Sequence, residues 1–159
     1  MGPSTCAPRI CNLAREVGVY IARSEAILVC GGTGGVMEAA AGGAKSAGGI
    51  TIGILPGPSE ADANPYIDIP IVTDLGNARN VINVLTSHAV IAVAGAYGTL
   101  SEIALALKCG KPVVGLETWG LIPPENQAPA EVVIARTPEA AVAEALRMAA
   151  RLMAEQKDR

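Results

Sequence analysis

Short apolar segments alternate with helical stretches along the sequence, and this alternation constrains the fold more than any other feature. Helical spacing of apolar residues and helix-terminal signals predict helices over 9–23, 36–47, 78–86 and 99–109, and a final helix that Thr137 caps. The apolar runs between them predict strands at 26–30, 50–55, 69–72, 88–93, 112–116 and 132–135. Strands and helices in this order indicate a Rossmann-like doubly wound parallel sheet with helices on both faces, a three-layer αβα sandwich of the α/β class.

The composition supports a core of aliphatic side chains. The chain has 159 residues, of which 50% are apolar and 17% charged, with no Phe, one Trp and three Tyr. Ala, Val, Ile and Leu must therefore fill the core, and these residues are typical of parallel sheets covered by helices. Because this length corresponds to about one domain, we expect a single Rossmann-like nucleotide- or phosphate-binding domain over residues 1–159.

Charge and hydropathy argue against two classes of partner. A net charge of −3 provides no long-range attraction for nucleic acid or for an anionic membrane. No apolar stretch reaches the ~18–20 residues of a membrane span, and the first residues lack a basic and then apolar leader. We therefore expect a cytoplasmic protein that binds neither nucleic acid nor membrane.

The cysteines and the single histidine do not have the spacing of a metal site. Cys6, Cys11, Cys30 and Cys109 contain no C-x-x-C pair, and His88 is the one histidine of the sequence. We expect four reduced thiols, no metal site and no intrinsic cofactor.

A glycine-rich turn, G-G-T-G-G, follows the strand predicted at 26–30. Several glycines before a helix free backbone N–H groups to face a ligand and allow close approach, which suits a phosphate. The turn is not a Walker loop, because Lys45-Ser46 lies at the far end of the next helix, and its spacing differs from the G-x-G-x-x-G of dinucleotide sites. The alternative is that the glycines only permit close packing of strand and helix. The candidate ligand-binding residues here are Gly31, Gly32, Thr33, Gly34 and Gly35.

A second turn of small residues, A-G-A-Y-G-T, follows the strand predicted at 88–93. It offers similar backbone donors, with the Thr99 hydroxyl at a predicted helix start. Thr99 and Glu102 also have the spacing of a capping box, in which the carboxylate accepts a hydrogen bond from the cap N–H. From spacing alone, capping explains Glu102 better than catalysis does. Tyr97 and Trp119 offer aromatic faces near this edge for a planar ring ligand, or pack as ordinary apolar residues.

Arg79 lies in the first turn of the helix predicted at 78–86, for which Asn77 is the expected cap. A cation at this position interacts unfavourably with the helix dipole, at a cost of about 0.3–1 kcal/mol. A nearby anion would offset this cost, and the loop lies at the same predicted sheet edge as both glycine turns. The alternative is a solvated Arg that reaches a surface carboxylate.

Together these segments resemble the lonely-guy-like superfamily (SLOG, formerly called lysine decarboxylase-like). The resemblance covers roughly residues 2–150 and rests on V-C-G-G-T-G-G-V-M-E-A-A, G-G-I-T-I-G-I-L-P-G, D-I-P-I-V-T-D-L-G-N-A-R-N, A-G-A-Y-G-T-L-S-E and G-K-P-V-V-G-L. The third motif and E-I-A-L-A-L-K-C-G-K-P-V-V are most similar to the small branch that includes molybdenum cofactor carrier proteins. The resemblance adds these candidate ligand-binding residues to those of the first turn: Ser4, Arg79, Asn80, Gly95, Ala96, Tyr97, Gly98, Thr99 and Glu102.

The enzymes of this superfamily are phosphoribohydrolases, which cleave the N-glycosidic bond of nucleoside 5′-monophosphates. The resemblance assigns their catalytic roles to Arg79 and Glu102. This sequence departs from them, since their P-G-G is A-G-A at 94–96 and their H-E-R-K is N-A-R-N at 77–80. Fewer charged groups leave fewer ways to stabilise an oxocarbenium-like centre or to protonate the leaving base.

We therefore expect a protein that holds a phosphorylated ligand, a pterin or a nucleotide, with molybdenum cofactor (molybdopterin) as the implied cargo. The alternative is a nucleoside 5′-monophosphate phosphoribohydrolase; a third reading, a nucleotide-sensing domain, has no specific residue in its support. The resemblance also implies a homodimer or homotetramer, with the apolar helix predicted at 99–109 as a contact. The superfamily begins with an apolar strand before a G-x-S loop, whereas this sequence opens on that loop. We therefore expect the sheet to lack its first strand and the chain to be marginally stable.

Overall fold

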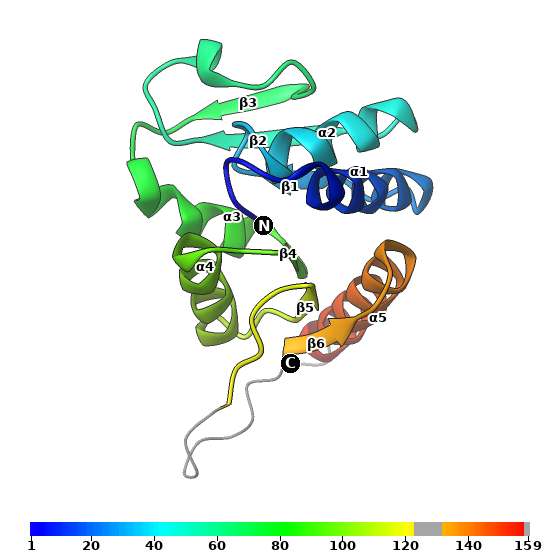
Figure 1. Cartoon of the computed structure of the whole chain (residues 1–159). Coiled ribbons are helices and arrows are strands. Elements are labelled where there is room, and N and C mark those ends of the chain that lie inside the picture. The colour runs from blue at the N-terminus through cyan, green and yellow to red at the C-terminus, as the bar shows by residue number, and fades with distance from the viewer. Residues whose placement is uncertain (123–131, 158–159) are drawn as a thin grey trace.

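Figure 1 shows the computed structural model of the chain, which describes residues 1–122 and 132–157. Helices and strands alternate through this part of the chain, as the sequence predicts. The elements in order are α1 (Pro8–Arg23), β1 (Leu28–Cys30), α2 (Val36–Ser46), β2 (Thr51–Leu55), the 3₁₀ helix η1 (Glu60–Asp62), β3 (Ile69–Val72), the 3₁₀ helix η2 (Gly76–Arg79), α3 (Asn80–Thr86), β4 (Val90–Val93), α4 (Tyr97–Lys108), β5 (Val113–Leu116), β6 (Val132–Ala135) and α5 (Pro138–Lys157).

The strands form two parallel sheets of three strands each, in the orders β1-β2-β3 and β4-β5-β6. Leu28 of β1 lies opposite Thr51 of β2, and Val90 of β4 lies opposite Val113 of β5. Pro70 lies in β3, which is the outer strand of its sheet, where a residue without an N–H is tolerated. The predicted Rossmann-like α/β class with parallel strands is confirmed.

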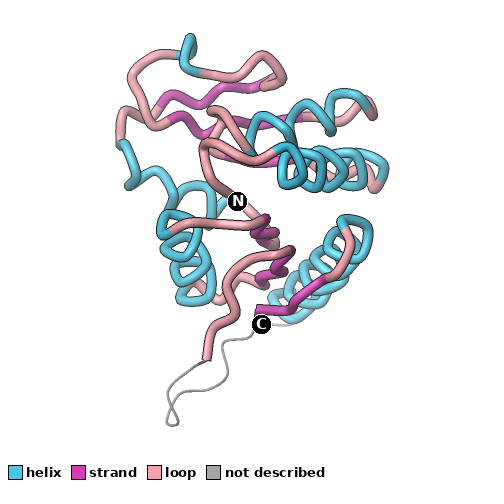
Figure 2. Tube along the Cα trace, viewed as in Figure 1, coloured by secondary structure: helices cyan, strands magenta, loops and turns pink. Residues whose placement is uncertain are grey.

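Helices cover both faces of these strands (Figure 2). Alternate residues of β4 face opposite layers: Val90 and Ala92 pack with Val84 of α3 and Ile103 of α4, whereas Val93 packs in the cluster built by α1 and α2. Helix α5 covers β5 and β6 on the same side as α1, and Figure 1 shows α1, α2 and α5 grouped together. The three-layer arrangement follows directly from the period of two along each strand.

Two glycines allow α1 and α2 to pack unusually close to each other. A Cβ on Gly18 would lie 1.9 Å from the Ala40 carbonyl oxygen, and one on Gly43 would lie 1.9 Å from that of Arg15. Glycine weakens a helix interior by about 1 kcal/mol relative to alanine, so its presence in both helices is explained by this backbone-to-backbone contact. The contact fixes α2, and with it the turn that precedes α2.

Local predictions at the helix ends are partly corrected. The Thr137 hydroxyl accepts from the Ala140 N–H at 3.2 Å, which confirms the predicted cap of α5. Asn77 does not cap α3, because a 3₁₀ turn, η2, occupies Gly76–Arg79 and α3 begins only at Asn80. The prediction of Asn77 as a cap was therefore wrong, although Arg79 does lie at the start of the helical segment.

Cys6 and Cys11 form a disulfide, so the expectation of four reduced thiols was wrong for this pair. The first turn of α1 brings their Cα atoms to 5.7 Å, a separation that a disulfide spans. Cys30 and Cys109 are free. Within the described ranges, no helix has the length and hydropathy to cross a membrane, and no group of three or more metal-binding side chains is found.

Candidate functional site

The two glycine turns predicted to bind a ligand lie at the same edge of the fold. The first follows β1 and the second follows β4, and both strands run parallel to their neighbours, so both turns emerge at carboxyl ends. This is the edge at which doubly wound folds bind ligands. The 3₁₀ helix η2 presents Arg79 to the first turn, and α4 presents Glu102 to Arg79.

The first turn is held in shape by a buried asparagine. Gly32 and Gly35 adopt φ of +75° and +66°, which glycine accepts without strain. The Asn64 side-chain amide donates to the carbonyls of Gly32 and Thr33 at 3.1 and 2.9 Å, and its backbone N–H also donates to Gly32. Sequence reasoning missed Asn64, because a single Asn in a polar loop gives no signal of a partner more than thirty residues away.

The N-terminal loop closes over the same turn. The Val36 N–H, at the start of α2, donates to the Pro3 carbonyl at 3.1 Å. A Cβ on Gly34 would lie 3.2 Å from the Ser4 carbonyl oxygen, and one on Gly35 only 2.4 Å from the Ser4 carbonyl carbon. The structure thus places Ser4 against the first glycine turn, and the absence of side chains at Gly34 and Gly35 makes room for it.

The second turn bends sharply before α4. Ala94 has φ +52° and Gly95 has φ +143°, so the chain turns in the left-handed region of φ directly after β4. A Cβ on Gly95 would approach the Thr99 Cβ to 2.7 Å, which shows how closely this turn packs on the helix it precedes. Thr99 is buried beneath the turn.

Glu102 does not cap α4. The helix begins at Tyr97, with Ala96 as its N-cap and no side-chain capping hydrogen bond, so Thr99 and Glu102 lie inside the helix. The capping-box interpretation was therefore wrong. Because the left-handed turn at Ala94 and Gly95 already redirects the chain, the helix starts two residues earlier than predicted, and Glu102 is available for another role.

Glu102 faces Arg79 in a largely buried pair. The Glu102 Oε1 lies 3.9 Å from the Arg79 Nη1, and each residue is only 9% exposed. Burial raises the pKa of the Glu102 carboxyl, while the Met1 ammonium and Arg79 act in the opposite direction. Burial likewise lowers the pKa of Arg79, although Glu102 opposes this. Both shifts disfavour the charged forms, as expected for a pair that is too far apart for a full hydrogen bond.

Arg79 lies directly over Gly31. A Cβ on Gly31 would come within 2.4 Å of Nη2 and 2.6 Å of Nη1, so only glycine leaves this space to the guanidinium. The Arg79 Nε is buried and has no hydrogen-bond partner. The side-chain amide of Asn83 lies between Arg79 and the Cys30 carbonyl. It is assigned the orientation in which its oxygen accepts from Arg79 Nη1 at 2.6 Å and its nitrogen donates to the Cys30 carbonyl at 3.3 Å. A buried cation therefore stands at the first glycine turn with unused donor capacity.

The outer rim of this region carries the remaining candidates. Asn80, Tyr97 and Gly98 line an open hollow between α3 and α4. Tyr97 is 81% exposed, its ring centroid lies 5.9 Å from that of Trp119, and a Cβ on Gly98 would meet nothing within 4 Å. The site thus has a cationic centre at Arg79 and Gly31 and an open aromatic rim at Tyr97. Ala96 is the N-cap of α4, directly before Tyr97.

Comparison with solved structures finds close matches among molybdenum cofactor proteins. The molybdenum cofactor binding protein from the phototrophic bacterium Rippkaea orientalis superposes with a TM-score of 0.82 at 42% identity, covering 93% of both chains. The molybdenum cofactor carrier protein from Chlamydomonas reinhardtii superposes with a TM-score of 0.80 at 42% identity, covering 94% of this chain and 96% of the other.

A more distant relative is an enzyme. The cytokinin riboside 5′-monophosphate phosphoribohydrolase of Mycobacterium tuberculosis is 36% identical over 118 residues, which are 69% of this chain and 63% of the enzyme. The model of the SLOG cluster4 family matches residues 1–142, which include both glycine turns, Arg79 and Glu102. The resemblance inferred from the motifs is thereby confirmed, and the chain belongs to the SLOG cluster4 family.

Proposed function

We propose that this protein binds and carries a phosphorylated pterin, the molybdenum cofactor, without converting it. The proposal rests on the surroundings of Arg79, whose buried guanidinium lies over Gly31. Its Nε has no hydrogen-bond partner among the described residues, and the Glu102 carboxylate, at 3.9 Å from Nη1, is too far away for a full hydrogen bond. A buried cation of this kind is incompletely compensated within the described part of the chain. A phosphate at the first glycine turn would supply the missing acceptor.

The proposed cradle combines this cation with backbone donors. Backbone N–H groups of the turns at 31–35 and 95–98 would face the phosphate, as at other glycine-rich helix starts. Ser4 and Thr99 would contribute hydroxyl groups from either side. Charge-assisted hydrogen bonds from an Arg to phosphate are among the stronger polar contacts in proteins, so Arg79 would dominate affinity.

The choice of a pterin rests on two supports. The two structural matches named above are a molybdenum cofactor binding protein and a molybdenum cofactor carrier protein, each similar over more than nine-tenths of this chain. The exposed Tyr97 on the rim offers a face on which a planar ring can stack. The molybdenum would arrive as part of the cargo.

The proposal is tested by equilibrium binding of molybdenum cofactor to the purified chain and to Arg79→Ala. Loss of a charge-assisted contact worth about 1.5–3 kcal/mol should weaken binding roughly 10- to 150-fold. Arg79→Lys keeps the charge but loses the planar guanidinium with its paired donors. Its affinity for the cofactor should therefore lie between that of the wild type and that of Arg79→Ala. Arg147→Ala, on the exposed side of α5, is the matched control and should bind as the wild type does.

Equal affinity in the wild type and in a folded Arg79→Ala variant would refute the assignment of the phosphate to this turn. Circular dichroism of each variant establishes that the fold is retained. If Arg79→Ala does not fold, Arg79→Lys carries the comparison alone.

A second candidate, a nucleoside 5′-monophosphate phosphoribohydrolase, is favoured by the pairing of Arg79 with Glu102. Because burial raises the pKa of Glu102, this carboxyl is suited to protonating a leaving base, while Arg79 would position the nucleotide phosphate. Incubation with a panel of nucleoside 5′-monophosphates distinguishes the two candidates. Release of free base that disappears in Glu102→Ala would establish the enzyme, whereas binding without release supports the carrier.

A further inference from the structure

The disulfide between Cys6 and Cys11 joins the two positions that a hydrophobic staple would use at the start of α1. Ala7 is the N-cap of this helix, so Cys6 immediately precedes the cap and Cys11 is the fourth residue of the helix. The N-cap makes no side-chain hydrogen bond, and the first turn contains no acidic residue. The covalent bond therefore takes the place of the contacts that usually fix the direction in which the chain enters a helix.

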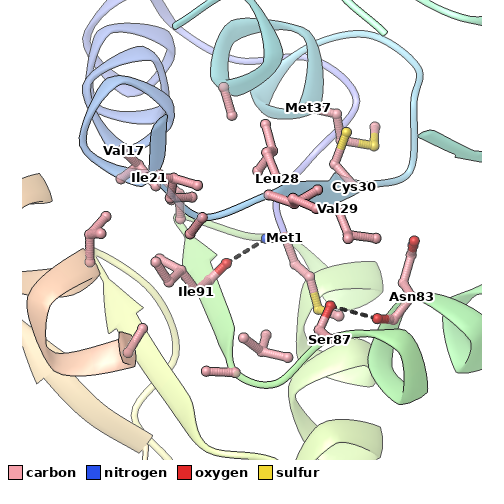
Figure 3. A pocket seen from close by; sticks show the side chains of 18 of the residues that line it. Met1, Val17, Ile21, Leu28, Val29, Cys30, Met37, Asn83, Ser87 and Ile91 are labelled. Atoms are coloured by element: carbon pink, nitrogen blue, oxygen red, sulfur yellow. Dashed lines mark hydrogen bonds between the residues drawn. The ribbon is translucent and has the colours of Figure 1, made fainter. Parts of the chain in front are cut away.

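The segment that enters α1 crosses from one glycine turn to the other, and we call its residues 2–7 the N-terminal strap. Met1, directly before the strap, lies against β4 in the wall of a cavity of about 460 Å³ (Figure 3), and its carbonyl accepts from the Val93 N–H at 2.8 Å. A Cβ on Gly2 would lie 2.4 Å from the Val36 Cγ1 and 2.8 Å from the Val93 carbonyl oxygen. The strap therefore connects the end of β4 with the start of α2.

The strap meets the first glycine turn through a backbone hydrogen bond and through close packing. The Pro3 carbonyl accepts from the Val36 N–H at 3.1 Å, and Ser4 packs against Gly34 and Gly35. Such a hydrogen bond contributes modestly to stability, because the freed groups can bond to water when the strap moves away. The order of the strap therefore depends on how firmly its far end is held.

The loop that the disulfide closes also carries Arg9, which reaches the end of β5. Its Nη1 and Nη2 each donate to one carboxylate oxygen of Glu117 at 2.5 Å, a paired arrangement that requires both side chains to be oriented. The Arg9 side chain is 70% exposed, and exposed ion pairs stabilise a fold only weakly because water and salt screen them. The ion pair therefore depends on the orientation of the disulfide loop more than it fixes that orientation.

The disulfide lies at the surface and closes a short loop. Both cysteines are half-buried, whereas Thr5, Ala7 and Arg9 beside them are exposed. Exposed disulfides exchange with thiols more readily than those enclosed in a core. Stabilisation by loop closure grows with the length of the loop, and the sequence separation of these cysteines is only 5. Opening the bond should therefore change the local order of the strap more than the stability of the whole chain.

We propose that Cys6 and Cys11 form a redox site whose reduction by a dithiol loosens the strap and weakens ligand binding at the first glycine turn. A thiolate of the reductant attacks one sulfur of the disulfide, which yields a mixed disulfide and releases the other cysteine as a thiolate. The second thiol of the reductant then displaces the first cysteine. The reductant becomes a disulfide, and two electrons and two protons pass to Cys6 and Cys11. The part of this inference that concerns the ligand rests on the function proposed above.

Reduction should lower ligand affinity because a loosened strap must be ordered each time a ligand binds. In the disulfide form, Ser4 is already held at the turn. Ordering the backbone of about one residue on binding would weaken affinity roughly 5- to 30-fold. The oxidised chain would thus hold its ligand and the reduced chain would release it, which gives a carrier a means of unloading.

The test compares the purified full chain before and after treatment with dithiothreitol, with inorganic phosphate as the probe. Alkylation followed by mass spectrometry measures the redox state of each cysteine. Residue-resolved amide hydrogen exchange at Val36 reports the bond to Pro3, and isothermal titration measures the phosphate affinity. The Ala39 N–H, which donates to Gly35 in the first turn of α2, is the internal control for exchange.

Two variants control for other effects of the reductant. Cys6→Ser/Cys11→Ser cannot form the disulfide and should behave like the reduced chain with or without dithiothreitol. Cys109→Ser changes an exposed cysteine outside the disulfide and should respond to dithiothreitol as the wild type does. The reduced wild type carries the comparison if the double serine variant does not fold.

Reduction should accelerate exchange at Val36, leave exchange at Ala39 unchanged and weaken phosphate binding roughly 5- to 30-fold. A disulfide that is absent from the oxidised protein or that resists dithiothreitol, unchanged exchange at Val36, or a response that persists in the double serine variant would overturn the proposal. Equal measurable phosphate affinity in the two redox states would also overturn it. Faster exchange at Val36 without phosphate binding in either state would support the redox site and count against the proposed phosphate site instead.

Discussion

At the scale of single residues, the candidate site depends on a missing side chain. Gly31 has no Cβ, and the Arg79 guanidinium occupies the space that a Cβ would take. The sequence suggested glycine for backbone donors and for ligand approach, whereas the structure shows a further role in accommodating a neighbouring side chain. The position of Arg79 therefore depends on the turn as much as on its own helix.

Gly31→Ala should displace this guanidinium. The new Cβ would lie 2.4–2.7 Å from its atoms, and the flexible end of Arg79 can move more cheaply than the backbone. We expect weaker binding of inorganic phosphate in isothermal titration, with an unchanged far-UV spectrum. Gly120→Ala, whose Cβ meets nothing within 4 Å, is the matched control. Unaltered phosphate affinity in Gly31→Ala would contradict the placement of the ligand beside Arg79.

Glu102 should make stability depend on pH. Its pKa in the folded chain is raised above its ordinary value of 4.5, so the folded state holds a proton that the unfolded state releases. The stability this contributes is fully present below the unfolded pKa and is lost as pH rises through the folded pKa.

Glu102→Gln should therefore flatten the fall in unfolding free energy as pH rises above about 4.5. Denaturant titrations at a series of pH values measure this slope. Glu139→Gln, at an exposed position of α5, should leave the slope as it is in the wild type. A slope that persists in Glu102→Gln would show that another group controls it.

At the scale of elements, the first glycine turn is stabilised by hydrogen bonds from a residue that is distant in the sequence. Asn64, in the loop before β3, supplies three hydrogen bonds to Gly32 and Thr33. The turn and the loop are thus a single structural unit. Asn64 is buried, so its amide cannot exchange these bonds for bonds to water.

Asn64→Ala should lower the unfolding free energy by about 1–3 kcal/mol, because two carbonyl groups of the turn lose a side-chain donor. It should also reduce phosphate affinity, since the turn loses its shape. Chemical denaturation and isothermal titration measure the two effects. Asn12→Ala, on the exposed surface of α1, should change stability by no more than about 0.5 kcal/mol. Asn64→Ala with the stability of the wild type would contradict this account.

The elements themselves were largely predictable from the sequence. The predicted strands at 69–72 and 132–135 have the bounds of β3 and β6, since apolar runs flanked by turn residues define them locally. The start of α4 was predicted two residues late, because left-handed φ values at Ala94 and Gly95 are not evident from propensity. The partners of Arg79 and of the first turn, Asn83 and Asn64, could not be predicted, because they depend on tertiary packing.

At the scale of the whole molecule, the exposed apolar residues bear on assembly. The predicted contact helix at 99–109 corresponds to α4, where Ile103 and Ala106 are buried in the core. On α3, by contrast, Leu85 is 57% exposed and Val81 is also exposed. An assembly of identical subunits, as the sequence resemblance implies, would cover these side chains.

We predict a homodimer or larger assembly in which α3 is at the contact. Leu85→Lys should lower the mass measured by light scattering, because it places a charge where an apolar contact is expected. Met153→Lys changes an exposed residue of α5 in the same way and should leave the mass unaltered. A wild type that is monomeric, or a Leu85→Lys variant of undiminished mass, would refute this contact.

The central claim is that the chain holds a phosphorylated pterin and releases it intact. The most direct measurement is a titration of the purified protein with molybdenum cofactor, followed by recovery of the ligand and its identification by mass spectrometry. The account predicts saturable binding of one ligand per chain and complete recovery of the unchanged cofactor. Absence of saturable binding, or recovery of a cleaved ligand, would contradict it.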